Sequence, residues 1–87
     1  MKKDNSIITM LNKSIGLELS KLRDKSGFSQ EDVVRNLQVM GIDMDRGTYS
    51  QIEIGNRKLL AHEIPFMAKV FNLSLHDFVD IIFSQEK

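Results

Sequence analysis

The feature that most constrains the fold is a helix-start unit that occurs three times along the chain, in the segments FSQEDV, MDRGTY and LSLHDF. In each segment a Ser or Asp follows one apolar residue, and a second apolar residue stands four positions after it. A short polar side chain at that place caps the first turn, and the two apolar residues pack across it. The unit therefore predicts three short helices, which begin at Ser29, Asp45 and Ser74.

Two further helices are predicted by apolar spacing alone. One carries apolar residues at intervals of four, four and three. The other carries them at intervals of three, one and three, also a helical spacing, with Pro65 in its first turn. Their apolar residues are Leu11, Ile15, Leu19 and Leu22 in the first, and Ile64, Met67, Ala68 and Phe71 in the second. Left-handed residues are expected at the helix ends, at Gly27, Gly41, Gly55 and Asn72. No long alternating run predicts a strand, so we expect an all-α fold, a compact five-helix bundle.

Composition excludes several classes of protein. The 87 residues include no cysteine, which excludes disulfide scaffolds and thiolate metal sites. No apolar run is long enough for a membrane span or a secretory signal, so we expect a cytoplasmic protein. His62 and His76 stand alone, without a second ligand at metal spacing, and we expect no metal, no cofactor and no enzymatic activity.

The charges balance overall but are unevenly distributed. Twelve basic and twelve acidic residues give a net charge of zero, which argues weakly against nucleic-acid binding. Residues 1–29 nevertheless have an excess of three positive charges, and residues 61–87 an excess of two negative charges. A neutral molecule of this kind can still present a basic face.

Several short motifs occur in a characteristic order between residues 15 and 78. They are IG at 15–16, LR at 22–23, GFSQE at 27–31, R-x-T-x-S-x-I-E-x-G-x-R at 46–57 and AKVFNLSLHDF at 68–78. Together they resemble the Cro/phage-repressor (XRE-like) helix-turn-helix family over about residues 11–80. The resemblance implies a lambda-repressor-like bundle in which residues 1–10 are an N-terminal arm and 11–80 the DNA-binding domain. Residues 81–87 would then end the C-terminal helix and provide a dimer contact.

This sequence departs from the family in the segment QVMGIDM, residues 38–44, which lengthens the turn between the second and third helices. We expect Ile42 and Met44 from this turn to tuck into the core. The resemblance also implies an ion pair between Arg23 and Glu53.

The resemblance implies that the third helix enters the major groove of DNA while the second lies across the backbone. On the side of the third helix opposite Tyr49 and Ile52, the expected base contacts are Arg46, Gly47, Ser50 and Gln51. An Arg pairs well with guanine and a Gln with adenine, whereas a Gly lets the backbone approach closely. The expected phosphate contacts are Gln30, Thr48, Asn56, Arg57 and Lys58.

The last helix is apolar almost all the way round. We expect Leu75, Phe78 and Ile82 to face the domain. We also expect a homodimer, with its contact through Val79, Ile82 and Phe83. In the alternative arrangement, residues 79–83 fold back onto the first helix and cover Leu11, Ile7 and Ile8.

The function expected from these features is sequence-specific binding of double-stranded DNA by a transcriptional regulator, in the role of a repressor. The alternative is a protein-interaction or antitoxin-type module on the same fold with little DNA binding. The zero net charge supports that alternative.

Overall fold

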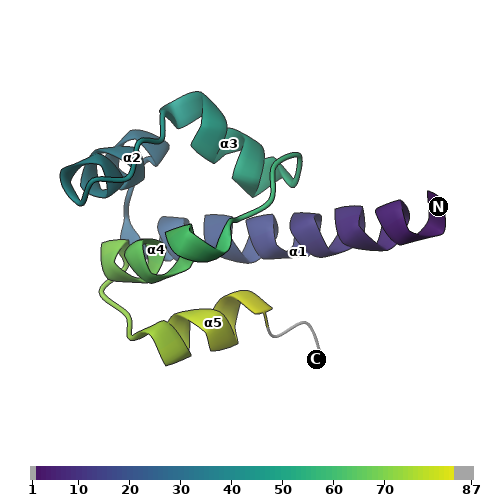
Figure 1. Ribbon diagram of the computed structural model, residues 1–87. Coiled ribbons are helices and arrows are strands. Elements are labelled where there is room, and N and C mark those ends of the chain that lie inside the picture. The colour runs from purple at the N-terminus through teal and green to yellow at the C-terminus, as the bar shows by residue number, and fades with distance from the viewer. Residues whose placement is uncertain (1, 84–87) are drawn as a thin grey trace.

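The computed structural model describes residues 2–83, with side chains from Ile7 onwards. Within these residues, five α-helices and one short 3-10 turn follow one another (Figure 1). They are α1 (Lys2–Ser26), α2 (Gln30–Val39), α3 (Arg46–Ile54), η1 (Ala61–Glu63), α4 (Ile64–Val70) and α5 (Leu75–Phe83). Residues 2–83 contain no strand, and the predicted all-α five-helix bundle is confirmed.

The predicted helix starts are confirmed in the hydrogen bonds of each first turn. The Ser29 hydroxyl accepts from the Asp32 amide at 3.0 Å, and the Asp32 carboxylate accepts from the Ser29 amide at 2.9 Å, which completes a reciprocal capping box. The side chains of Asp45 and Ser74 accept from the backbone three residues further on, at 2.8 and 3.0 Å. Local sequence therefore determines where α2, α3 and α5 begin.

Four helices end in the same way, at a residue with positive φ. These residues are Gly27, Gly41, Gly55 and Asn72, as predicted. After each of them the next amide donates to a carbonyl five positions earlier, as in the 2.9 Å bond from Ile42 to Leu37. This pattern is the Schellman motif, which satisfies the last carbonyls of a helix while the chain turns away.

The lengthened turn between α2 and α3 is ordered by contacts of its own. Met44 is buried and Ile42 is partly buried against the core, as expected. The Gln38 side-chain amide donates to the Met44 carbonyl at 3.0 Å. The additional residues therefore add the Met44 side chain to the core and the Ile42 side chain at its edge.

The first helix is longer than predicted, because α1 already begins at Lys2. Residues 2–10, expected to form an arm, are the first turns of a single helix that runs past the rest of the fold in Figure 1. No Gly or Pro interrupts the sequence before Gly16, so no residue in this stretch stops the helix from extending toward the N-terminus.

The position of α5 corrects the expected dimer contact. Ile82 is fully buried together with Phe78, so it packs in the core and is not available to a second copy. Leu75, expected to face the domain, is half-exposed instead. The alternative fold-back is also incomplete, because α5 packs on α1 and α4 but leaves Leu11 exposed.

Candidate nucleic-acid interface

The helix expected to read DNA, α3, is held firmly from its inner side. Tyr49 and Ile52 are buried in the core, as their spacing predicts. Gly16 of α1 lies directly against the carbonyl groups of Ile52 and Glu53, so closely that a Cβ atom would have no room. The backbones of α1 and α3 therefore touch at Gly16, and the direction of α3 is tied to that of α1.

The outer side of α3 is polar except for Ile54, which is 52% exposed at the end of the helix. Arg46, Gly47 and Gln51 are exposed, and Ser50 is partly buried. The structure thus brings together the four residues predicted as base contacts on one helix, with three of them open to solvent. Gln51 also accepts a hydrogen bond from the Asn56 side-chain amide at 3.0 Å.

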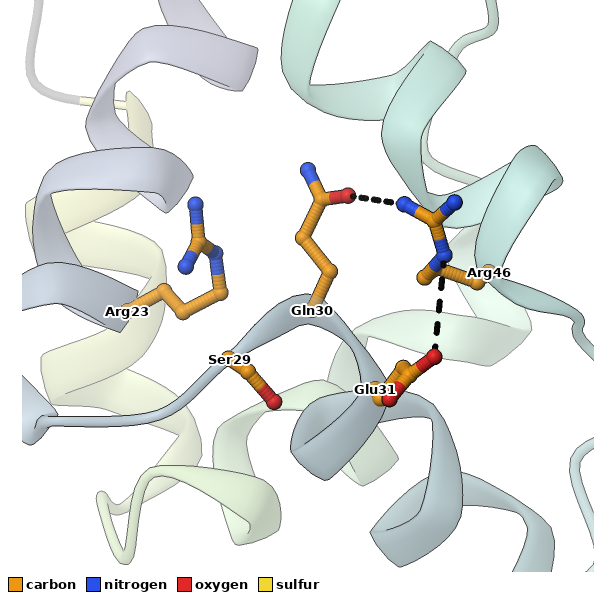
Figure 2. A pocket seen from close by; sticks show the side chains of 5 residues that line it. All are labelled: Arg23, Ser29, Gln30, Glu31 and Arg46. Carbon is orange, nitrogen blue, oxygen red and sulfur yellow. Dashed lines mark hydrogen bonds and ion pairs between the residues drawn. The ribbon is translucent and has the colours of Figure 1, made fainter.

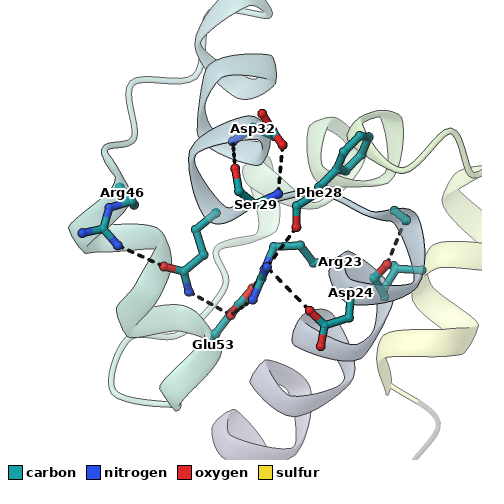
Figure 3. A network of polar contacts seen from close by, with 10 residues as sticks. Arg23, Asp24, Phe28, Ser29, Asp32, Arg46 and Glu53 are labelled. Carbon is teal, nitrogen blue, oxygen red and sulfur yellow. Dashed lines mark hydrogen bonds and ion pairs between the residues drawn. The ribbon is translucent and has the colours of Figure 1, made fainter.

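A polar network joins three helices behind this surface (Figure 3). Arg23 of α1 donates two hydrogen bonds to the Glu53 carboxylate of α3, from Nε at 2.7 Å and from Nη2 at 3.1 Å. Gln30 of α2 donates to the same carboxylate at 3.0 Å, and Arg23 also donates to the Phe28 carbonyl at 3.0 Å. The expected pair of Arg23 and Glu53 is confirmed, and it has Gln30 as a third member.

The Glu53 carboxylate stays ionised in this setting. Burial alone would raise its pKa, but hydrogen bonds, led by those from Arg23, outweigh the burial and lower it. The buried Tyr49 hydroxyl lies next to this carboxylate without a hydrogen bond of good geometry among the described residues. Burial raises the pKa of Tyr49, and the negative charge of Glu53 raises it further.

A shallow hollow of about 270 Å³ lies where α1, α2 and α3 approach one another (Figure 2). Arg46 reaches into it and donates to the Gln30 side-chain oxygen at 3.4 Å, while its Nε lies 4.0 Å from the Glu31 carboxylate. Gln30 therefore has an oriented amide, with its nitrogen toward Glu53 and its oxygen toward Arg46. The N-terminal turn of α2 also borders the hollow, and such a turn favours anions.

Of the residues after α3, Arg57 is less available to contact DNA than the sequence indicated. Arg57 donates two hydrogen bonds of 2.8 Å to the Glu63 carboxylate and a third of 2.9 Å to the Lys58 carbonyl. Its guanidinium is thus occupied within the loop that leads to α4. Lys58 is exposed, and Thr48 is partly buried on the first turn of α3.

Sequence reasoning did not identify Glu63, which is only 3% exposed. Burial by itself would raise the pKa of Glu63, but hydrogen bonds from Arg57 and from the Leu60 amide outweigh it and lower that pKa. Arg57 and Glu63 are six residues apart across a loop, so no helical or strand period links them. Glu31 was also missed, because its proximity to Arg46 depends on how α2 meets α3.

Comparisons with known proteins found no matching family model, no matching curated protein and no matching solved structure. None of the helices described is long and apolar enough to span a membrane. Within the described residues, no group of three or more His, Asp or Glu side chains is placed to hold a metal ion.

Proposed function

We propose that this chain is a sequence-specific double-stranded DNA-binding regulator, a cytoplasmic repressor of the XRE-like type that acts by occupying its site. In this proposal α3 reads base edges in the major groove, and the first turn of α2 lies over the phosphate backbone. The observation that carries it is the construction of α3, whose inner side is buried in the core while its outer side, apart from the exposed Ile54, is polar and mostly open to solvent.

Arg46 and Gln51 read bases in this proposal, since both are exposed on α3 and have suitable hydrogen-bonding groups. Gly47 and Ser50 lie beside them and contact DNA through backbone or hydroxyl groups. Before binding, Arg46 rests on Gln30 and Glu31, and it leaves the Glu31 carboxylate when a base or phosphate replaces it.

Phosphate contacts in this proposal come from Gln30, Thr48, Asn56 and Lys58. Arg57 has a different role, because its guanidinium is already paired with Glu63. It shapes the loop after α3 and so positions the backbone of Lys58.

The proposed regulator is a homodimer, because nanomolar binding by so small a reading surface needs two half-sites. Of the residues expected at the dimer contact, Val79 and Phe83 of α5 stay partly exposed, whereas Ile82 is buried.

The experiment that tests this function is selection of binding sites from random DNA duplexes, followed by titration of the selected duplex at two salt concentrations. A DNA-binding regulator enriches one motif, and its affinity falls steeply as salt rises. The second candidate is a protein-interaction module of antitoxin type, favoured by the zero net charge and by Glu31 beside Arg46. No enrichment and no salt-dependent binding would reject DNA binding in favour of that module.

A further inference from the structure

The guanidinium of Arg46 contacts two side chains of α2, and the two contacts use different parts of it. Nη1 lies 3.4 Å from the Gln30 side-chain oxygen, and Nε lies 4.0 Å from a Glu31 carboxylate oxygen (Figure 2). In a guanidinium the Nε hydrogen and one Nη2 hydrogen point the same way, and this fork can pair with two neighbouring acceptors. Gln30 therefore holds Arg46 through Nη1, while Glu31 lies at the fork.

The orientation of the Gln30 amide is fixed by the network behind it. Its side-chain nitrogen donates to the Glu53 carboxylate at 3.0 Å, and Arg23 donates two more hydrogen bonds to the same carboxylate. An ionised carboxylate only accepts hydrogen bonds, so it keeps the amide nitrogen on its own side. The amide oxygen of Gln30 is thereby directed to Arg46.

The contact with Glu31 is weaker and more open to water. The side chains of Arg46 and Glu31 are 59% and 68% exposed, and solvent screens an ion pair of this kind. A fork that pairs with O6 and N7 of guanine is stronger than such an exposed pair. A phosphate, by contrast, offers Arg46 one exposed ion pair in place of another. Guanine is therefore the group best able to displace Glu31 from the fork.

We propose that Arg46 reads one guanine with its Nε–Nη2 fork, that Gln30 positions the guanidinium by keeping Nη1, and that Glu31 competes with the guanine for the fork. This inference rests on the proposed function and deepens it, because it names the base and gives two neighbouring residues opposite effects. Gln30 is a positioning residue, since it restricts Arg46 before binding and so reduces the entropy lost on binding. Glu31 is an intramolecular competitor, and it weakens binding.

Glu31 is also suited to a test by substitution. Its side chain has no other hydrogen bond or ion pair within the part of the chain that the structure describes. The reciprocal cap of α2 is made by its neighbours Ser29 and Asp32. Removing the charge of Glu31 therefore leaves the fold intact and acts on Arg46.

Titration of the selected duplex with the full chain and its variants tests the proposal. Glu31→Gln is expected to strengthen binding by up to about five-fold, because the competitor loses its charge. Gln30→Met is expected to weaken binding by about two- to ten-fold and to relax the guanine preference at one position. Both titrations are repeated in the Arg46→Ala background, where both substitutions are expected to lose most of their effect.

Two further variants serve as controls. Asp80→Asn removes an exposed acidic residue from α5, so it changes the net charge as Glu31→Gln does, and it is expected to bind like the parent. Arg46→Lys keeps the charge of Arg46 but has no fork. It is expected to lose the guanine preference while binding stays equally dependent on salt. Thermal melting of each variant checks that it is folded.

The outcomes separate this inference from the proposed function. A parent that enriches no motif and shows no salt-dependent binding rejects both. A parent that binds its motif, but gains nothing from Glu31→Gln, overturns the inference alone. So does a weakening by Gln30→Met that is equally large in the Arg46→Ala background, because Gln30 then contacts phosphate without positioning Arg46. A motif in which Arg46→Ala relaxes no guanine also overturns it.

Discussion

Arg57 and Glu63 face each other across the loop after α3, with two guanidinium nitrogens each 2.8 Å from a carboxylate oxygen. The carboxylate is buried, and it also accepts from the Leu60 amide at 2.9 Å. Paired hydrogen bonds of this kind fix both side chains in one plane. The pair therefore closes the loop between the proposed reading helix and α4.

Arg57→Ala is expected to destabilise the fold, because it leaves the buried Glu63 carboxylate without its main partner. The expected loss is about 1–3 kcal/mol in the free energy of unfolding, measured by urea denaturation. Arg57→Lys, which keeps the charge but cannot make both bonds, is expected to recover part of it. A loss no larger than that of the exposed control Lys69→Ala would contradict the role of the pair.

Arg23 and Glu53 are expected to be energetically coupled. Arg23→Ala is expected to cost about 1–3 kcal/mol, since the Glu53 carboxylate loses its two charged hydrogen bonds. A double-mutant cycle with Glu53→Gln is expected to give a coupling above about 0.5 kcal/mol by denaturant titration. Strictly additive effects would show that the pair does not hold α1 to α3.

Stability is expected to fall in acid because Glu53 and Glu63 have pKa values below the usual 4.5. A carboxyl whose pKa is lowered in the folded state contributes its full stabilisation above the unfolded value. That contribution is lost as pH falls through the lower folded value. Melting temperature measured from pH 7 down to pH 3 is expected to drop below about pH 4.5.

Glu63→Gln is the variant that isolates this effect. It is expected to be less stable at pH 7 and to lose less stability on acidification, because one of the two titrating carboxyls is gone. An acid slope identical to that of the parent would contradict the assignment of Glu63. Glu53 still titrates in this variant, and together with Asp32 and Asp45, which cap helices and also have lowered pKa values, it accounts for the slope that persists.

Two glycines within helices are expected to respond oppositely to alanine. At Gly47 an added Cβ meets only an Asp45 oxygen at 3.6 Å, so Gly47→Ala is expected to be stabilising by up to about 1 kcal/mol. At Gly16 the Cβ would press on the backbone of α3, and Gly16→Ala is expected to cost about 1–3 kcal/mol or more. Thermal unfolding of both variants measures the contrast, and a stabilised Gly16→Ala would show that the helices are not in backbone contact.

Recognition is expected to depend on Arg46 and Gln51. Each change to Ala is expected to weaken binding to a selected duplex by about 1–3 kcal/mol and to relax preference at one base position. Lys69→Ala, an exposed change on α4, is the matched control and is expected to bind like the parent. If both α3 variants bind the duplex as strongly as the parent, α3 does not read the DNA bases.

The starts and ends of the helices were predictable from short segments. Ser29 caps α2 through atoms within three residues of it, and Gly41 ends the same helix through a bond that spans five residues. Such interactions depend on nearby sequence alone, so short segments were sufficient to predict where the helices begin and end. The pair of Arg23 and Glu53 was expected only because the motifs resembled a known family.

The prediction of which residues of α5 are exposed was wrong, because burial there depends on helices that are distant in the sequence. Ile82 and Leu75 are equally apolar, yet Ile82 is buried by the packing of α5 on α1 and α4 while Leu75 is exposed. Helical periodicity shows which residues lie on the same side of a helix. It does not show how much of the helix surface the neighbouring helices bury.

The sequence by itself therefore determined the helical class of this protein and its cap residues, because capping hydrogen bonds and turns act over a few residues. Only the tertiary structure decided that Glu63 is buried against Arg57, that Gly16 brings α1 onto α3, and that α1 extends past the core with apolar side chains exposed. These features arise where segments that are distant in the sequence contact each other, because such contacts determine which side chains are buried and which charges pair.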